Sequence, residues 1–346
     1  MAESSTTYFA HSRMMPNEPR GPDVSDIVVV TGASAGVGRA TVRAFARRGA
    51  SLALLARDPE RLDAAVKDAE AAGGRAVGIP LDVADADSVE HAAEAVEALF
   101  GPIDVWVNNA MVSVFSPVHE LTADEVRRVT EVTYLGSVNG TLSALRRMRP
   151  RGRGTIVQVS SALAYRSIPL QAAYCGAKHA TEGFTDSLRC ELLHDHSGVR
   201  VTSVVLPALN TPQFEWVRTK LPGHPQPVPP IYQPEVAAEA IVWAAAHAPR
   251  DLKVGMPTLL AIYANRLAPG LLDRYLALTG YDSQQLDEAV DTTRPDNLYE
   301  PIDGAHGAHG RFDTHARARC WQLAARTTIA DVVGSAVTAI RGRKHR

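Results

Sequence analysis

The turn after the first apolar run constrains the fold of this chain more than any other feature. Residues 27–30 (Ile-Val-Val-Val) form a short β-branched run of the kind buried on both faces of a parallel sheet. Residues 31–38 read Thr-Gly-Ala-Ser-Ala-Gly-Val-Gly and lead into a helical pattern at 39–48. Glycines let the backbone turn tightly, and the unpaired N–H groups of a helix start attract an anion. The segment predicts a strand, a phosphate-binding loop and a helix.

Strand and helix patterns alternate from this turn to residue 206. Apolar runs of strand length lie at 51–56, 76–80, 104–107, 155–160 and 201–206. Helical patterns lie at 59–72, 88–100 (with Asp87 as its N-cap), 122–148 and 174–194. Such alternation predicts βαβ units with right-handed crossovers. We therefore expect an α/β fold, with a doubly wound parallel sheet of the Rossmann type.

The regular pattern fails after residue 206. Residues 207–234 are rich in proline and predict a long loop, which in a compact domain is usually functional or mobile. A helix at 234–247 and a short strand at 253–255 return to the pattern, and a last helix is expected near 317–340. The predicted organisation is a disordered leader at 1–26, one Rossmann domain at 27–256 and a C-terminal helical extension at 257–346.

Composition excludes several kinds of partner. The formal net charge of −2 gives no reason to expect nucleic acid or an anionic membrane as the main partner. Three cysteines cannot form a complete disulfide framework, which favours reduced thiols and a cytoplasmic location. No secretory signal and no apolar run long enough to span a membrane is present. His306, His309 and His315 lie in a Gly-rich stretch without cysteine, so exposed loop histidines are favoured and no metal is predicted.

Three side chains provide candidate chemistry. Tyr174 and Lys178 are four residues apart at a helix start, so one helical turn places them on the same face. A nearby ammonium favours the phenolate, so Lys178 is expected to lower the pKa of Tyr174. Ser161 follows the strand at 155–160, and its hydroxyl can hold a substrate oxygen beside the phenol. Ser160 competes for this role and is assigned to the strand end.

These motifs together resemble the short-chain dehydrogenase/reductase family over residues 28–255, including the interval from Ser161 to Tyr174. The resemblance implies an NAD(P)(H)-dependent oxidoreductase that interconverts an alcohol and a carbonyl, here on a fairly apolar small molecule. Tyr174 would be the general acid and base, and Lys178 would also hold the nicotinamide ribose. The alternative is a non-catalytic or weakly active dinucleotide-binding protein on the same fold. A homodimer or homotetramer through the helices at 122–148 and 174–194 is also implied.

The end of the second strand indicates which cofactor is used. No carboxylate stands at the strand tip, where one would bind the ribose 2′-OH of NAD, and Arg57 follows instead. Its planar guanidinium can pair with a 2′-phosphate, and Ser34 can add a hydrogen bond, so NADP(H) is favoured over NAD(H). Together with the residues that the resemblance implies, the expected cofactor-binding set is Gly32, Ser34, Ala35, Gly36, Val37, Gly38, Arg57, Asp82, Val83, Asn109, Ala110, Tyr174, Lys178, Pro207 and Thr211.

Three positions depart from the family pattern. Met111 replaces a glycine after Asn108-Asn109-Ala110, and Thr133 stands where the family has an asparagine that supports a water chain to the lysine. Thr133 can hold a water but lacks an amide, so a different proton relay or slow turnover is expected. Ala208 replaces a glycine, and its Cβ would strain a positive φ. These departures keep the non-catalytic alternative open.

The substrate pocket is expected to be walled by the loop after Val112, the proline-rich stretch 207–234 and the extension. Residues 259–278 carry apolar and aromatic side chains near helical spacing. Packing against the core or a subunit interface is the favoured interpretation, and a lid or surface helix that admits apolar substrates is the alternative. The basic residues of 311–346 are expected to be solvated, with peripheral contact to a membrane surface as the alternative.

Overall fold

The computed structural model describes residues 26–304 and 306–343, so all but the last residue of the expected leader at 1–26 lies outside the described residues. Seven strands form one sheet in the order β10-β7-β6-β4-β1-β2-β3, and every pair in it is parallel. This confirms the predicted α/β fold of the Rossmann type. The strands are β1 (Ile27–Thr31), β2 (Ser51–Ala56), β3 (Arg75–Pro80), β4 (Val105–Asn108), β6 (Gly154–Ser161), β7 (Val199–Leu206) and β10 (Asp251–Lys253).

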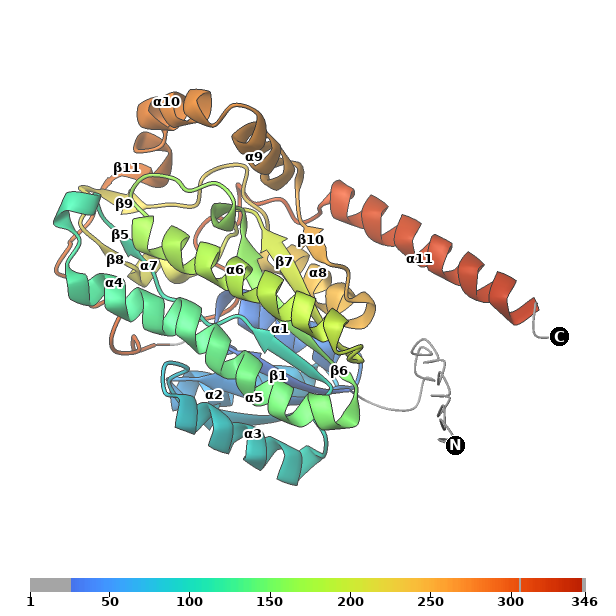
Figure 1. The fold of residues 1–346 in the computed structure, drawn as a ribbon. Coiled ribbons are helices and arrows are strands. Elements are labelled where there is room, and N and C mark those ends of the chain that lie inside the picture. The colour runs from blue at the N-terminus through green and yellow to red at the C-terminus, as the bar shows by residue number, and fades with distance from the viewer. Residues whose placement is uncertain (1–25, 305, 344–346) are drawn as a thin grey trace, which may run out of the picture.

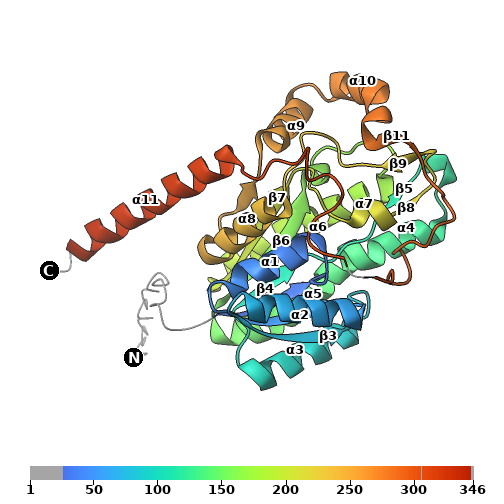
Figure 2. The ribbon, with the colours of Figure 1, turned by 180° about the vertical axis from the view of Figure 1, so that it is seen from behind.

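Helices cover both faces of the sheet because its strands bury side chains in both directions. Val28 and Val30 of β1 join one apolar cluster and Val29 joins the other, all without solvent exposure. The first face carries α1 (Gly36–Ala46), α2 (Pro59–Ala71) and α8 (Pro234–His247), seen in Figure 2. The second carries α3 (Ala86–Phe100), α4 (Ala123–Thr130), α5 (Gly136–Arg151) and α6 (Ala172–His194), in front in Figure 1.

The helix predicted at 122–148 is interrupted. α4 begins with a capping box between Thr122 and Glu125, and the π-helical turn η2 (Glu131–Leu135) separates it from α5. A π turn inserts one residue into the helical repeat, which periodicity of apolar residues does not reveal. The N-cap predicted for α3 is also wrong: the Asp85 carboxylate, rather than that of Asp87, accepts the first N–H groups of this helix.

The proline-rich stretch is more ordered than a loop. It contains α7 (Gln213–Trp216), β8 (Arg218–Thr219) and β9 (Gly223–Pro225). β8 pairs with β5 (Val114–Phe115), and β9 pairs with β11 (Gln285–Ala289) of the extension. Three short 3-10 turns lie outside this stretch: η1 (Val118–Glu120), η3 (Ala162–Ala164) and η4 (Asp282–Gln284).

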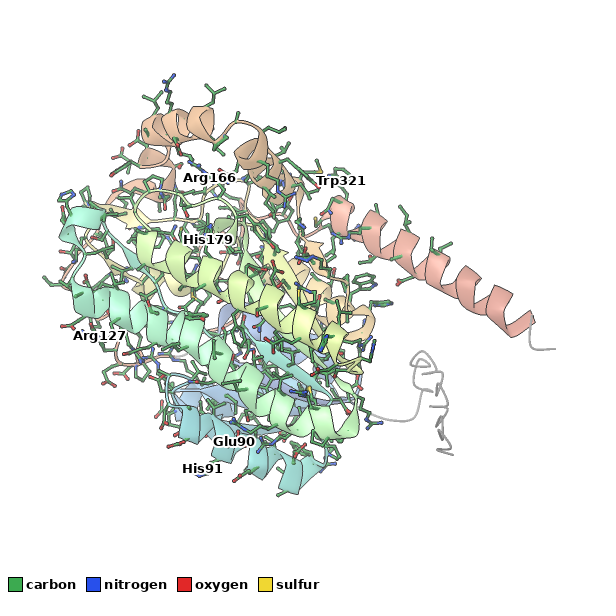
Figure 3. All side chains as sticks on the ribbon, in the orientation of Figure 1. Glu90, His91, Arg127, Arg166, His179 and Trp321 are labelled. Atoms are coloured by element: carbon green, nitrogen blue, oxygen red, sulfur yellow. The ribbon has the colours of Figure 1, made fainter. Side chains whose placement is uncertain are left out.

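The extension adds α9 (Met256–Leu267) and α10 (Pro269–Thr279), which stand above the sheet in Figure 1. Arg166, labelled near these helices in Figure 3, donates to Asn265 at 3.0 Å and Asp273 at 2.7 Å. The expected packing of 259–278 against the core is seen only in part: Ile262 is buried, whereas α10 has no buried residue.

The last helix, α11 (Trp321–Arg343), projects away from the body of the molecule (Figures 1 and 2). Trp321, at its base in Figure 3, is 69% exposed. Within 26–304 and 306–343, none of the helices is both long enough and apolar enough to cross a bilayer.

Candidate active site

One cavity of about 430 Å³ lies at the carboxyl ends of the central strands. Ligands of open α/β sheets bind at this edge. All expected cofactor-binding residues except Gly38 line this cavity, and so do Ser160 and Ser161, whereas Thr133 does not. The lining residues of that set are Gly32, Ser34, Ala35, Gly36, Val37, Arg57, Asp82, Val83, Asn109, Ala110, Tyr174, Lys178, Pro207 and Thr211.

The glycine loop requires glycine at three positions, either for its backbone conformation or because a side chain would not fit. Gly32 and Gly36 have φ of +64° and +54°, the left-handed region that favours glycine. A Cβ at Gly38 would meet the Gly32 carbonyl and lie 2.7 Å from Nδ2 of Asn109, so Gly38 allows α1 to start against the loop. The N-cap residue Ala35 gives α1 no side-chain cap. The start of α1 therefore has N–H groups to offer an anion.

A hydrogen-bonded junction joins the loop to the end of β4. Oγ1 of Thr31 accepts the N–H of Asn109 at 2.9 Å and that of Ala110 at 3.0 Å. Nδ2 of Asn109 donates to the carbonyls of Thr31 at 2.9 Å and Gly32 at 3.2 Å. Asn109 thus fixes the loop as well as lining the cavity.

Ser161, Tyr174 and Lys178 come together from the end of β6 and the first turns of α6. The Ser161 hydroxyl, which accepts the Leu163 N–H at 3.1 Å, is near enough to the Tyr174 phenol to lower its pKa. Lys178 is 3% exposed, its Nζ donates to the carbonyl of Val159 at 2.7 Å, and it lies 5.7 Å from the centre of the Tyr174 ring. The arrangement holds a phenol, a hydroxyl and an ammonium at one wall of the cavity.

The pKa values of this group differ from the sequence-based expectation. Burial raises the pKa of Tyr174 above its ordinary value, and Ser161 opposes this rise without cancelling it. The expected lowering of the Tyr174 pKa is therefore wrong, because burial dominates; the Lys178 ammonium donates to the Val159 carbonyl. Burial lowers the pKa of Lys178 to about 8, against the opposing charge of Glu182. At neutral pH the pair is therefore a neutral phenol beside a largely protonated amine.

Thr133 is buried in the protein interior and does not line the cavity. It is fully buried in the π turn η2, where its hydroxyl donates to the carbonyl of Val112 at 2.9 Å and accepts the Val112 N–H at 3.1 Å. The side chain therefore orders the loop after β4. Ala208 is not among the described residues with positive φ, so its Cβ causes no strain of the kind considered above.

Part of the extension returns across the mouth of the cavity. We call residues 296–304 and 306–310 the cover segment. Nη1 and Nη2 of Arg57 donate at 2.6 Å to the carbonyls of Tyr299 and Asn297. The N–H of Gly36 donates to the carbonyl of Gly307 at 3.2 Å. Residues of the cover segment that line the cavity are Asn297, Pro301 and Ile302.

Asp82 is also connected to the cover segment. Its carboxylate accepts the Ala84 N–H at 3.0 Å and pairs with the guanidinium of Arg128. Nε of Arg128 in turn donates to the carbonyl of Leu298 at 3.0 Å. The adenine contact expected of Asp82 would therefore form beside an ion pair that the sequence did not reveal.

Arg61 is a cavity residue that sequence reasoning missed. It lies in the first turn of α2, its side chain is 8% exposed, and its Nη2 has no hydrogen-bond partner among the residues that the structure describes. Burial lowers the pKa of its guanidinium. The available signal was its position four residues after Arg57, just inside the helix whose N-cap is Asp58.

The remaining cavity wall is largely apolar. All three segments expected to form it contribute: the loop after Val112, the proline-rich stretch and the extension. The apolar side chains include Met111, Phe115, Leu163, Ile168, Phe214, Val228, Pro229, Pro230, Pro257 and Ala261. Polar groups here are few, so this wall suits an apolar molecule.

The histidines of the extension have other partners. His309 lies 2.9 Å from both Glu235 and Asp313, which raise its pKa although burial opposes them. His306 contacts the ring of Trp216, with centroids 4.4 Å apart. No group of three metal-binding side chains occurs in the part of the chain that the structure describes.

The donors present fit a dinucleotide. The cavity is lined by the start of α1, by Arg57 after β2 and Arg61 in the first turn of α2, and by the Ser161, Tyr174 and Lys178 group. The buried, unpaired Nη2 of Arg61 supports this fit, because such a group is costly without an acceptor. Arg57, Asp82 and the start of α1 would hold the adenosine and diphosphate half, and Lys178 the nicotinamide half.

Comparison with known proteins agrees with this geometry. The family model described as short chain dehydrogenase matches residues 26–221. "Uncharacterized oxidoreductase YxnA" of Bacillus subtilis (strain 168) is 32% identical over 317 residues, which cover 90% of this chain and 88% of that protein. "Dehydrogenase/reductase SDR family member 7B" of Bos taurus is 32% identical over 270 residues, covering 72% of this chain and 80% of that protein.

A solved structure is also similar. It is an alcohol dehydrogenase from the archaeon Thermococcus sibiricus, complexed with 5-hydroxy-NADP. The two chains are 27% identical with a TM-score of 0.56, and the match covers 67% of this chain and 96% of the archaeal one.

Proposed function

The chain belongs to the short chain dehydrogenase family, and from this premise we propose that it interconverts an alcohol and a carbonyl on a fairly apolar small molecule. The observation that supports this most is that one cavity is lined by the glycine loop, the tip of β2 and the Ser161, Tyr174 and Lys178 group. A dinucleotide extending from the loop to this group would bring its nicotinamide to the phenol.

The nicotinamide, when bound, supplies or accepts the hydride at the reacting carbon. Ser161 orients the substrate oxygen by a hydrogen bond, beside the phenol at the same wall of the cavity. Tyr174 donates its proton to that oxygen during reduction and removes it during oxidation. The phenol is protonated at neutral pH, so its proton is available for reduction of a carbonyl, whereas burial makes the phenolate needed for oxidation harder to form. Lys178, whose Nζ donates to the Val159 carbonyl in the same wall of the cavity, would hold the nicotinamide ribose.

The tip of β2 supports NADP(H) over NAD(H). Asp58, the only carboxylate next to Arg57, is the N-cap of α2 and pairs with Arg61 at 2.9 Å. Both of its oxygens are therefore committed to Arg61, one to the backbone N–H and one to the guanidinium, and it is poorly placed to accept the ribose 2′-OH of NAD. Arg57 and Arg61 both line the cavity between β2 and α2, and their positive charges favour a cofactor with an additional phosphate on this ribose. The archaeal alcohol dehydrogenase binds an NADP derivative, which agrees with this proposal.

The proposal is tested by following NADPH and NADH oxidation with a panel of apolar ketones and aldehydes. We expect turnover of at least one carbonyl, faster with NADPH. A protein that binds NADPH tightly but turns over no carbonyl, and in the reverse direction oxidises no alcohol, would instead fit the non-catalytic alternative.

We also propose a homo-oligomer in the cytoplasm. The helices expected at the interface carry exposed apolar side chains: Val126, Leu135, Leu142 and Leu193 are 39%, 41%, 42% and 70% exposed. The three cysteines are free, which agrees with a reducing compartment. Light scattering on the purified protein tests the assembly, and a monomer at micromolar concentration would contradict it.

A further inference from the structure

The cover segment uses hydrogen-bond donors that a bound dinucleotide would need. The N–H of Gly36, in the glycine loop, donates to the carbonyl of Gly307 at 3.2 Å. Both terminal nitrogens of Arg57 donate at 2.6 Å to carbonyls of the cover segment, those of Asn297 and Tyr299. These donors lie at the half of the cavity that would hold the adenosine and diphosphate. The backbone of the extension therefore occupies part of the surface that would bind an anion.

Both ends of the cover segment are fastened outside the cavity. At one end, Asp296 pairs with Nε of Arg218 at 2.7 Å, and the side chain of Leu298 is fully buried. At the other end, His309 lies 2.9 Å from the carboxylate of Glu235 in α8. None of these five residues lines the cavity. The ends are therefore held by contacts that do not involve a ligand in the cavity.

The part between these ends is more exposed. Residues 299–304 are exposed apart from the half-buried Ile302, which lines the cavity together with Asn297 and Pro301. Oδ1 of Asn297 is buried and has no hydrogen-bond partner within the described part of the chain, so an acceptor is left unused at the cavity wall. An exposed segment that is held mainly at its ends opens at a small cost in free energy, because few buried contacts are lost.

We propose that the cover segment is a gate for the dinucleotide, which opens to admit the adenosine and diphosphate half and then closes over it. The inference rests on the proposed function only in that the chain binds a nicotinamide dinucleotide. Opening frees the N–H of Gly36 for the diphosphate. Closing returns Asn297, Pro301 and Ile302 to the wall of the cavity. Entry and release of the cofactor both need the open form, so both rates depend on how firmly the ends are fastened.

The alternative is a fixed wall, which contacts the bound cofactor but does not move. Weakening the fastened ends of a fixed wall changes the dissociation rate alone, because entry of the cofactor does not involve it. Weakening the ends of a gate raises the population of the open form and so changes both rates. The two roles are therefore distinguished by kinetics rather than by affinity.

The experiment measures association and dissociation of NADPH by stopped flow, followed by the fluorescence of the nicotinamide. Asp296→Asn weakens one end of the cover segment, and His309→Ala weakens the other. For each variant we expect both rate constants to rise roughly 2- to 5-fold, the range for loss of one ion pair near the surface. The double variant should show roughly the product of the two effects, because the two ends are fastened at separate places.

Asp195→Asn is the matched control. Asp195 pairs with Arg149 at 2.6 Å, and neither residue lines the cavity or belongs to the cover segment, so both rate constants should stay within about twofold of the native values. The gate is overturned if the dissociation rate rises alone, if the association rate rises alone, if neither changes, or if the control rises equally. A native protein that binds neither NADPH nor NADH would refute the proposed function itself, and the gate with it.

Discussion

Gly38→Ala tests whether the glycine loop is set by close packing at the start of α1. An alanine Cβ there would meet the carbonyl oxygen of Gly32 and lie 2.8 Å from its carbonyl carbon and 2.7 Å from Nδ2 of Asn109. The first two are backbone atoms, which cannot rotate away. The loop or the helix must therefore shift, and the two bonds from Asn109 to the loop carbonyls would be strained or lost.

The expected cost follows from these contacts. Overpacking costs roughly 1–3 kcal/mol, and two hydrogen bonds contribute about 1 kcal/mol each. Alanine gains about 1 kcal/mol over glycine in helix propensity. The free energy of unfolding should fall by roughly 2–4 kcal/mol in total, and binding of NADPH should weaken because the loop is displaced.

Gly183→Ala in α6 is the control, because a Cβ there meets nothing within 4 Å. It should gain about 0.5–1 kcal/mol from helix propensity alone. Urea denaturation of the two variants beside the native protein measures both effects. If Gly38→Ala is as stable as Gly183→Ala and still binds NADPH normally, the packing argument for the loop is refuted.

Two further predictions concern the reacting group and its support. Glu182 opposes the burial that lowers the pKa of Lys178 to about 8, so Glu182→Gln should lower that pKa further. The alkaline limb of the rate–pH profile then moves to lower pH, and an unmoved limb would contradict the role of Lys178. Thr133→Val removes both bonds to the Val112 backbone and should cost roughly 2–4 kcal/mol of unfolding free energy, measured by urea denaturation. A variant within about 0.5 kcal/mol of the native protein would show that the Thr133 hydroxyl is dispensable.

Local patterns were sufficient to predict the sheet and most of the helices. Residues 51–56 and 234–247 form β2 and α8 with the predicted bounds. The glycine spacing and the interval between Tyr174 and Lys178 correctly indicated residues that line one cavity. These features depend on neighbours in sequence, which a single chain displays directly.

The features that the sequence did not predict depend on contacts between residues that are far apart in the sequence. Arg57 bonds to carbonyls more than two hundred residues away, and backbone carbonyls carry no side-chain signature. The pKa direction of Tyr174 was mispredicted because spacing shows that Lys178 is near, but not how deeply the fold buries the phenol, and burial is what raises its pKa. The cover segment has no regular periodicity, so its path over the cavity could not be read from the sequence.

The central claim is that the Tyr174 phenol transfers the proton. The direct measurement is the steady-state rate of carbonyl reduction with NADPH by Tyr174→Phe and by the native protein, at matched saturation with cofactor. General acid catalysis contributes roughly 10²- to 10⁴-fold, so we predict a loss of turnover in that range with NADPH affinity nearly unchanged. Equal rates in the two proteins would contradict the account.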